Sequence, residues 1–153
     1  MKLKTLVAAM AVGLGTFSAM AQTQTGPVKI GFITDMSSLY ADIDGPAGGE
    51  MIKWAVQDFG GSVLGRPVEV LTADHQNKAD VASSKAREWI DKDNLSMLVG
   101  GTSSGTALAM SKVAAEKKRP FLVIGAGSAR LTNEDCTRPT PSTTPTTPSR
   151  WPR

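Results

Sequence analysis

The stretch LSMLVGGTSSGT, from Leu95 to Thr106, and the stretch FLVIGAGS, from Phe121 to Ser128, decide the fold class. Each begins as a short apolar run that is typical of a buried strand, and each ends in glycines and hydroxyl residues. Glycine lets a ligand approach the main chain, and the N-terminus of a following helix presents free N–H groups to an anion. The two stretches therefore predict neighbouring strand-to-helix turns that bind a small molecule carrying a carboxylate.

The rest of the chain alternates strands and helices around these turns. Apolar runs and helical spacing predict strands at 28–34, 67–72 and 95–99, a fourth from Phe121, and helices at 46–59, 79–91 and about 104–118. This alternation predicts an α/β fold with a parallel, doubly wound sheet and helices on both faces. Ligands of such sheets bind outside the carboxyl ends of the strands, where the strand order reverses. Trp54 and Trp89 lie on predicted helices and are interpreted as packing residues.

Residues 1–21 have the features of a secretory signal peptide. Lys2 and Lys4 precede an apolar stretch at 6–17, and Ala19-Met20-Ala21 fits the small-residue pattern of a cleavage site. Cleavage there leaves Gln22 first rather than Cys, so we expect no lipid anchor at that point. The expected location is therefore the periplasm.

Composition and charge favour one modest domain and argue against several other classes. The chain has 153 residues, 41% of them hydrophobic, and a formal charge of +3. Several of the Lys and Arg residues lie near the two ends of the chain. The sequence contains no run of basic residues with interleaved aromatics, so it does not indicate nucleic-acid binding. Cys136 is the single cysteine, so it is either a free thiol or the partner of a cysteine further along a longer chain.

Residues that support catalysis or metal binding are sparse. His75 is the only histidine and has no nucleophilic partner in a known motif, so we expect it to form hydrogen bonds at a strand end. The spacing of the nearby aspartates matches no metal-binding loop, and they are interpreted as solvated loop carboxylates. The glycine-rich turns match neither common nucleotide-binding pattern. The sequence therefore predicts no catalytic residue, no metal and no cofactor. The aspartates are Asp35, Asp42, Asp44 and Asp74.

The last residues, 137–153, break the alternating pattern. They contain six Thr and five Pro and have no apolar periodicity, which is typical of a disordered linker. A shifted reading frame is the second interpretation, because the codons of these residues permit a Tyr- and Ala-containing peptide when read two bases later. The coding DNA beyond Cys136 decides between the two.

The chain carries an ordered set of short motifs: VKIGFIT at 28–34, Asp44-Gly45, Gly60-Gly61, LGRPVEV at 64–70, Asp74-His75-Gln76, GGTSS at 100–104 and GAGS at 125–128. This ordered set resembles one protein family, the periplasmic substrate-binding proteins of branched-chain amino-acid-type ABC transporters. The resemblance covers about Val28 to Cys136, and it implies two α/β lobes, joined by a hinge, that close on an amino acid or a similar carboxylate. It also implies a membrane permease as partner. Chains of the family are far longer, so 22–136 is interpreted as a partial N-terminal lobe.

The resemblance also implies roles for individual residues. Ser104, next to Ser103, corresponds to the serine that binds the ligand carboxylate, and Tyr40 lies where the family places residues near the mouth of the cleft. Gly125, Ala126, Gly127 and Ser128 correspond to the turn near the ammonium group of the ligand, although a Thr expected near Gly127 is missing. Ser104 as a simple helix cap, a merely structural turn at 125–128 and Tyr40 as a surface aromatic remain alternatives.

The expected function is solute binding without chemistry, as the extracytoplasmic component of an ABC importer. A single incomplete lobe does not enclose a ligand, so we expect no binding tighter than about 1 mM, which corresponds to about 4 kcal/mol. An exported α/β enzyme of unknown chemistry and a sensor domain of the same fold are the alternatives.

Overall fold

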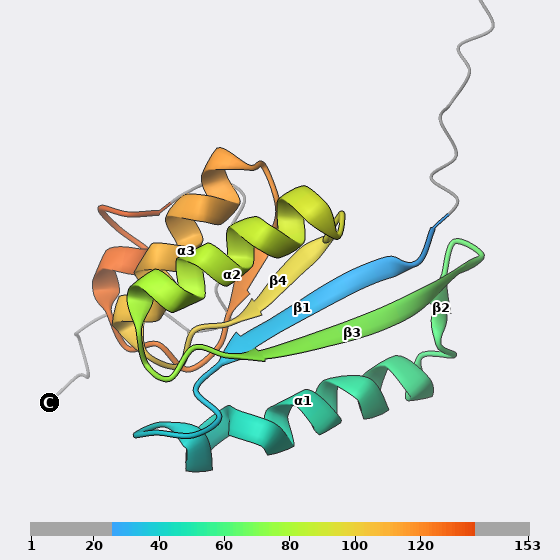
Figure 1. Cartoon of the computed structure of the whole chain (residues 1–153), viewed down its shortest axis with the longest axis horizontal. Helices are drawn as coiled ribbons and strands as arrows, with labels where there is room; N and C mark the ends of the chain where they lie inside the picture. Colours follow the sequence, from blue (N-terminus) through green and yellow to red (C-terminus); the bar gives the residue numbers. More distant parts are fainter. Residues whose placement is uncertain (1–25, 137–153) are drawn as a thin grey trace, which may run out of the picture.

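The computed structural model describes residues 26–136 (Figure 1). The predicted signal peptide at 1–21 and the tail at 137–153 lie outside this range. The described residues form one five-stranded sheet in the order β2-β3-β1-β4-β5. Its strands are β1 (Val28–Thr34), β2 (Ser62–Val63), β3 (Arg66–Asp74), β4 (Met97–Gly100) and β5 (Phe121–Val123). The helices are α1 (Ala41–Asp58), α2 (Ala79–Lys92), α3 (Ser104–Glu116) and the short 3-10 helix η1 (Ala129–Leu131).

The strand pairing confirms the predicted parallel sheet. β1 is parallel to β3 on one side and to β4 on the other, and β4 is parallel to β5. The prediction missed β2, a two-residue strand that pairs antiparallel with the start of β3 at the edge of the sheet. Leu64 and Gly65, between them, have φ of 51° and 73°, which closes the connection tightly.

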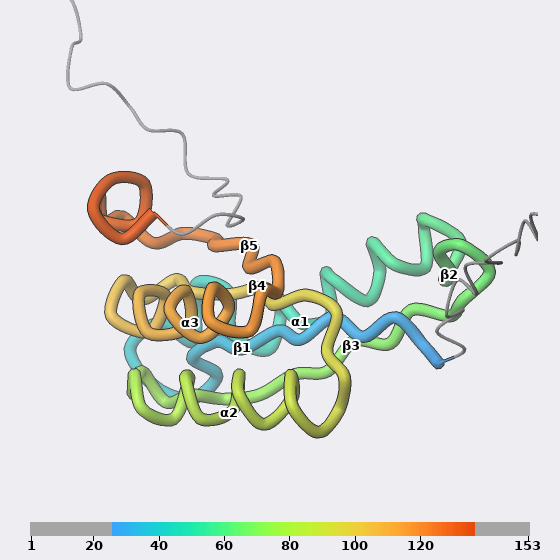
Figure 2. The backbone as a smooth tube through the Cα atoms, turned by 90° about the horizontal axis from the view of Figure 1, so that it is seen from above, coloured from blue at the N-terminus to red at the C-terminus, as the bar shows by residue number. Residues whose placement is uncertain are grey.

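Helices cover both faces of the sheet, with α2 and α3 together on one face and α1 on the other (Figures 1 and 2). Ile33 belongs to the main apolar core with Leu98, Phe121 and Met110, all of which are fully buried. The neighbouring Phe32 points to the other face, where it meets α1. Each fully buried large side chain contributes about 1.5–3 kcal/mol, so this core is the main source of stability.

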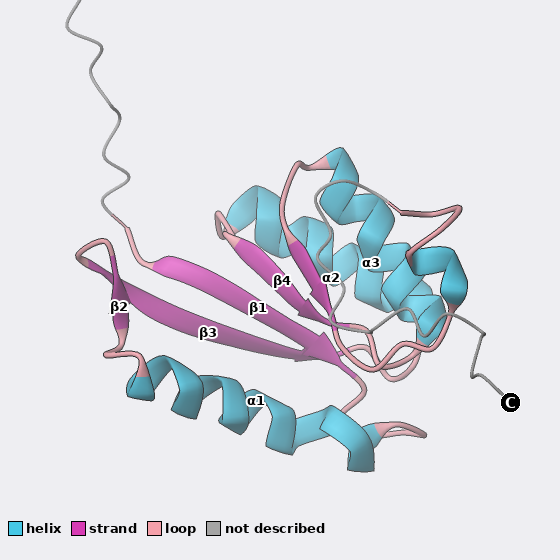
Figure 3. Cartoon of the chain, turned by 180° about the vertical axis from the view of Figure 1, so that it is seen from behind, coloured by secondary structure: helices cyan, strands magenta, loops and turns pink. Residues whose placement is uncertain are grey.

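Glycines bring α1 close to the sheet, along the side of β3 (Figure 3). A Cβ atom on Gly48 would lie 2.9 Å from the Phe32 ring, and one on Gly49 would lie 3.0 Å from Thr72. A kink at Gly45, with ψ of −124°, separates the first turn of α1 from the part that begins at Pro46. The predicted helix at 46–59 matches this second part, and proline suits the first position of a helix.

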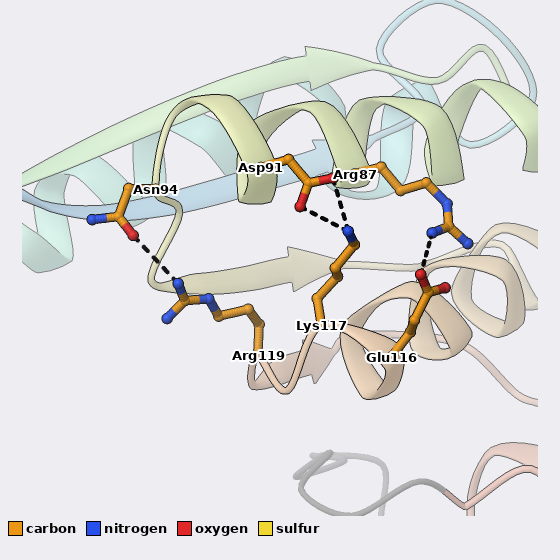
Figure 4. Close-up of polar contacts among 6 residues, drawn as sticks. All are labelled: Arg87, Asp91, Asn94, Glu116, Lys117 and Arg119. Atoms are coloured by element: carbon orange, nitrogen blue, oxygen red, sulfur yellow. Dashed lines mark hydrogen bonds and ion pairs between the residues drawn. The ribbon is translucent and has the colours of Figure 1, made fainter.

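Polar pairs on the surface join α2 to α3 (Figure 4). Arg87 pairs with Glu116 at 2.8 Å, and Lys117 pairs with Asp91 at 2.8 Å. These side chains are partly exposed, between 27% and 53%, so the pairs orient the two helices more than they stabilise them. No helix among residues 26–136 is both long and apolar enough to cross a membrane.

The two tryptophans that were interpreted alike differ in the structure. Trp89 is 8% exposed and packs in the core, as predicted, but Trp54 is 59% exposed on α1. The interpretation of Trp54 as a packing residue is therefore wrong for the fold of residues 26–136. Gly48 and Gly49 turn a different side of α1 toward the sheet.

Candidate ligand-binding site

The carboxyl ends of β1, β4 and β5 meet at one edge of the sheet, because the three strands are parallel neighbours. The chain leaves β1 for β3 on one side and later reaches β4 on the other. The strand order thus reverses between β1 and β4, which is where sheets of this type bind ligands. The three turns that follow these strands form the candidate site.

The turn after β4 requires glycine at two positions. Gly100 has φ of +141°, and a Cβ atom there would lie 2.1 Å from the carbonyl oxygen of Ile33 in β1. Gly101 has φ of +87°, and its Cβ would lie 2.9 Å from Ala107 in α3. The turn therefore lies so close to β1 and α3 that a side chain larger than that of glycine does not fit at either position.

Ser103 and Ser104 lie at the start of α3. Ser103 is the residue before the helix, and its side chain makes no capping hydrogen bond. Its carbonyl oxygen accepts hydrogen bonds from the Ala107 N–H and the Thr106 hydroxyl, both at 2.9 Å. Ser104 is the first helical residue, so the capping role considered for it is wrong, since Ser103 holds the cap position. The first N–H groups of α3 have no partner within the helix and favour an anion.

The turn at 125–128 lies beside the turn after β4. The Ile124 N–H donates to the Gly100 carbonyl at 2.9 Å, and a Cβ on Gly125 would lie 3.4 Å from the Thr102 hydroxyl. Gly125 and Gly127 are exposed and Ser128 is half-buried, whereas Ala126 is buried at 2% exposure. The structure thus brings the 125–128 turn next to the 100–104 turn.

Tyr40 closes the turn that follows β1. Its N–H donates to the Asp35 carboxylate at 2.9 Å, and the Ser38 N–H and hydroxyl donate to the same carboxylate at 2.9 and 2.5 Å. Burial raises the pKa of Asp35, but these hydrogen bonds outweigh burial, so the pKa lies below its ordinary value. Asp35 is 1% exposed, so its interpretation as a solvated carboxylate is wrong.

Asp44 connects the turns and was not recognised from the sequence as a site residue. Its carboxylate accepts a hydrogen bond from the Thr34 hydroxyl at 2.9 Å, and a second one from the Thr102 hydroxyl. These bonds join the first turn of α1 to the ends of β1 and β4. The pattern Asp44-Gly45 before a helix was the only signal in the sequence.

His75 lies at the end of β3, as predicted. The main-chain N–H of His75 donates to the Thr34 carbonyl at 2.8 Å. The Nδ1 atom of its side chain accepts a hydrogen bond from the Asn77 main-chain N–H at 3.0 Å. The side chain is 1% exposed, and its Nε2 atom has no hydrogen-bond partner among the described residues. Burial lowers the pKa of His75, although the carboxylates of Asp35 and Asp74 oppose this.

Hydrogen bonds, rather than cations, satisfy the carboxylates at this edge. Asp74 accepts from the Met36 N–H at 3.0 Å, the Ser37 hydroxyl at 2.5 Å and the Gln76 N–H at 2.7 Å. The ion pairs found among residues 26–136 involve neither Asp74 nor Asp35 nor Asp44. No group of three or more His, Cys, Asp or Glu residues in this range has the arrangement of a metal site. The N-terminus of α3, whose first N–H groups have no partner within the helix, lies at this same edge of the sheet.

Comparison with known proteins gives one family and a consistent set of structures. A family model described as "periplasmic binding protein" matches residues 27–152. A periplasmic binding protein from Burkholderia mallei is 67% identical, with a TM-score of 0.73, over 74% of this chain and 30% of that one. A branched-chain amino acid ABC transporter periplasmic ligand-binding protein from Burkholderia xenovorans is 39% identical, with a TM-score of 0.69, over 72% of this chain and 29% of that one.

A third structure extends the range of ligands among the relatives. It is a solute-binding protein of an ABC transporter from Rhodopseudomonas palustris in complex with benzoate. It is 28% identical, with a TM-score of 0.69, over 76% of this chain and 32% of that one. No functionally curated protein matches the chain. The chain spans about 30% of the length of the solved structures that it matches.

Proposed function

Because the chain belongs to the periplasmic binding protein family, we propose that it forms part of the extracytoplasmic solute-binding component of an ABC importer. The predicted signal peptide at 1–21 directs it to the periplasm. The ligand is an amino acid of the branched-chain type or a similar small carboxylate, and the partner is a membrane permease. The names of two relatives, one a branched-chain amino acid transporter protein and one bound to benzoate, support this ligand class.

One observation carries the proposal. The N-terminus of α3, with Ser103 and Ser104, lies at the point where the strand order reverses, and its cap position provides no side-chain hydrogen bond. In our proposal the Ser104 hydroxyl and the free N–H groups of α3 bind the ligand carboxylate. The adjacent turn at 125–128 contacts the rest of the ligand head group, and Tyr40 lies at the mouth of the site.

This site is one wall of a cleft whose opposite wall belongs to a second lobe. The chain spans about 30% of its relatives, so the other wall is part of the proposal and not of the described residues. A single wall leaves most of the ligand in water. We therefore expect a dissociation constant of about 1 mM or weaker for this chain.

Titration of the isotope-labelled chain, followed by amide NMR shifts, tests the proposal. Benzoate and leucine at about ten times this dissociation constant are expected to shift the amides of residues 103–106 and 125–128. Benzamide has the same shape as benzoate without the charge, so it is expected to shift them far less. Ser104→Ala is expected to weaken the benzoate effect, whereas Ser84→Ala, on exposed α2 surface, leaves it unchanged. Equal shifts by benzoate and benzamide, or shifts spread evenly over the surface, contradict the proposed site.

A further inference from the structure

The carboxylate of Asp44 joins three segments of the chain. Asp44 itself belongs to the first turn of α1. One of its oxygens accepts a hydrogen bond of 2.9 Å from the Thr34 hydroxyl at the end of β1, and the other accepts one from the Thr102 hydroxyl in the turn after β4. Thr34 is 0% exposed and Thr102 is 9% exposed, so water competes little for either hydroxyl. Because hydrogen bonds to a charged acceptor are stronger than neutral ones, the two bonds fix the three segments to one another.

Thr102 carries this connection on to the turn at 125–128. Its hydroxyl oxygen lies 3.5 Å from the Ile124 carbonyl oxygen, and a Cβ atom on Gly125 would lie 3.4 Å from the same hydroxyl oxygen. A threonine hydroxyl has one proton to donate, and the nearer acceptor is the Asp44 carboxylate. Asp44 therefore determines the rotamer in which the Thr102 side chain packs against the start of the 125–128 turn.

A kink gives the first turn of α1 its own attachment to this edge of the sheet. Gly45, with ψ of −124°, separates the turn that contains Asp44 from the part of the helix that begins at Pro46. Gly45 is buried, and a Cβ atom there would lie 3.1 Å from the Asp35 carbonyl oxygen. The Asp35 carboxylate accepts the Tyr40 N–H at 2.9 Å. The first turn of α1 thus packs on the segment that ends at Tyr40, and the hydrogen bonds of Asp44 join both to the sheet.

We infer that Asp44 is a positioning residue of the candidate site: it holds Thr102, and through Thr102 the 125–128 turn, in place relative to the first turn of α1. The ion pairs among residues 26–136 do not include Asp44, so hydroxyl groups rather than a cation orient its carboxylate. Asp44 acts through Thr102 and has no assigned contact with the ligand. That the positioned turns bind a carboxylate rests on the proposed function, whereas the positioning itself does not.

Amide NMR of the ligand-free chain tests the positioning directly. Asp44→Ala removes both hydrogen bonds and is expected to shift the amides of residues 102–104 and 124–128, while the amide of the buried Met110 stays where it is. Asp42→Ala is the matched control, because Asp42 is an exposed carboxylate in the same turn of α1. Its effect is expected to stay within that turn. Equal shifts at 124–128 in the two variants overturn the inference.

A double-substitution cycle separates transmission through Thr102 from a general loosening of the fold. Thr102→Val removes the hydroxyl, and in that chain Asp44→Ala is expected to cause almost no further shift at 124–128. Thr102→Ser keeps the hydroxyl and is expected to retain nearly the parent spectrum. Asp44→Asn keeps one acceptor oxygen, so it replaces Asp44→Ala if the latter does not fold, and smaller shifts in the same direction are expected. Additive effects of the two substitutions at 124–128 overturn the inference.

Titration with benzoate relates the positioning to ligand binding. Thr102→Val breaks the bond to Asp44 without changing the charge of the site, and it is expected to raise the dissociation constant of benzoate about threefold or more. Thr102→Ser keeps the bond and is expected to bind benzoate nearly as the parent chain does. Equal affinities of Thr102→Val and the parent chain overturn the inference. A parent chain that binds neither benzoate nor leucine contradicts the proposed function instead, and the ligand-free spectra then decide the role of Asp44.

Discussion

Gly100→Ala tests whether the turn after β4 is held as tightly as the structure indicates. The substitution adds one methyl group at a residue whose φ is +141°, at a point 2.1 Å from the Ile33 carbonyl oxygen. An unusual φ costs an alanine about 1–3 kcal/mol. The close contact is with main chain, so no side chain can rotate away, and β1 and β4 must separate. Strain of this kind typically adds about 1–3 kcal/mol. We therefore expect Gly100→Ala to lower the free energy of unfolding by about 2–6 kcal/mol.

Gly65→Ala is the matched control for the cost of φ alone. Gly65 has φ of +73°, and nothing lies within 4 Å of the position of its Cβ. The free energy of unfolding of this variant is expected to be lower than that of the parent chain by about 1 kcal/mol. Urea unfolding followed by tryptophan fluorescence measures both variants against the parent chain, since Trp89 is 8% exposed and reports on the core. The midpoint of Gly100→Ala is expected to fall by about 1–3 M urea, and that of Gly65→Ala by less than about 1 M. Equal decreases in the unfolding midpoint of the two variants would refute the close approach of the turn to β1.

Three further predictions concern His75, the carboxylates of Asp35 and Asp74, and Met110. Burial lowers the pKa of His75 from its ordinary value of 6.5, so the unfolded chain takes up a proton at a higher pH than the native state does. The free energy of unfolding is therefore expected to fall as the pH drops below about 6.5. Urea unfolding between pH 7.5 and 5 measures this dependence, and the variant His75→Gln is expected to lose it. Hydrogen bonds hold the pKa values of Asp35 and Asp74 below the ordinary value of 3.8. The stability that these carboxylates provide is therefore present above about pH 3.8 and is lost as the pH falls further. Urea unfolding between pH 5 and 2.5 tests this, and unchanged midpoints over that range would contradict it. Met110→Ala empties a fully buried position and is expected to cost about 2–5 kcal/mol in thermal or urea unfolding, whereas Met51→Ala on the exposed face is expected to cost less than about 0.5 kcal/mol.

The order of elements was predictable because buried parallel strands leave continuous apolar runs in the sequence. The run at Leu98 and Val99 and the run that begins at Phe121 are both strands of the sheet, and the glycines after them form tight turns. The positive φ of Gly100 and Gly125 agrees with the conformational reason for glycine at these positions. Local pattern was sufficient here because the feature being predicted is itself local.

The orientation of α1 was not predictable from local pattern. Met51, Ile52, Trp54 and Val56 make apolar stripes on two sides of the helix, and spacing alone does not choose which side meets the sheet. Packing decides, because Gly48 allows the helix to approach Phe32 closely on one side only. Trp54 is left exposed as a result.

The burial of Asp35 was missed for a similar reason. A carboxylate after a strand looks like a solvated loop residue when only its neighbours in the sequence are considered. Here the main chain of the following turn folds back over it, and the N–H groups of Ser38 and Tyr40 replace water. The Asp44–Thr102 hydrogen bond joins residues far apart in the sequence, and no short motif predicts such a contact.

The position of β1 between β3 and β4 also sets the order in which the chain can fold. As the chain is synthesised, β1 is complete while both strands that will flank it are still unmade. Its second edge stays open until Met97 arrives beside Ile30. An apolar strand with open edges pairs readily with other chains. Contacts so distant in sequence also slow folding. The nascent chain therefore passes through a long period in which its central strand needs protection, and we expect its yield to depend on chaperones that hold unfolded chains.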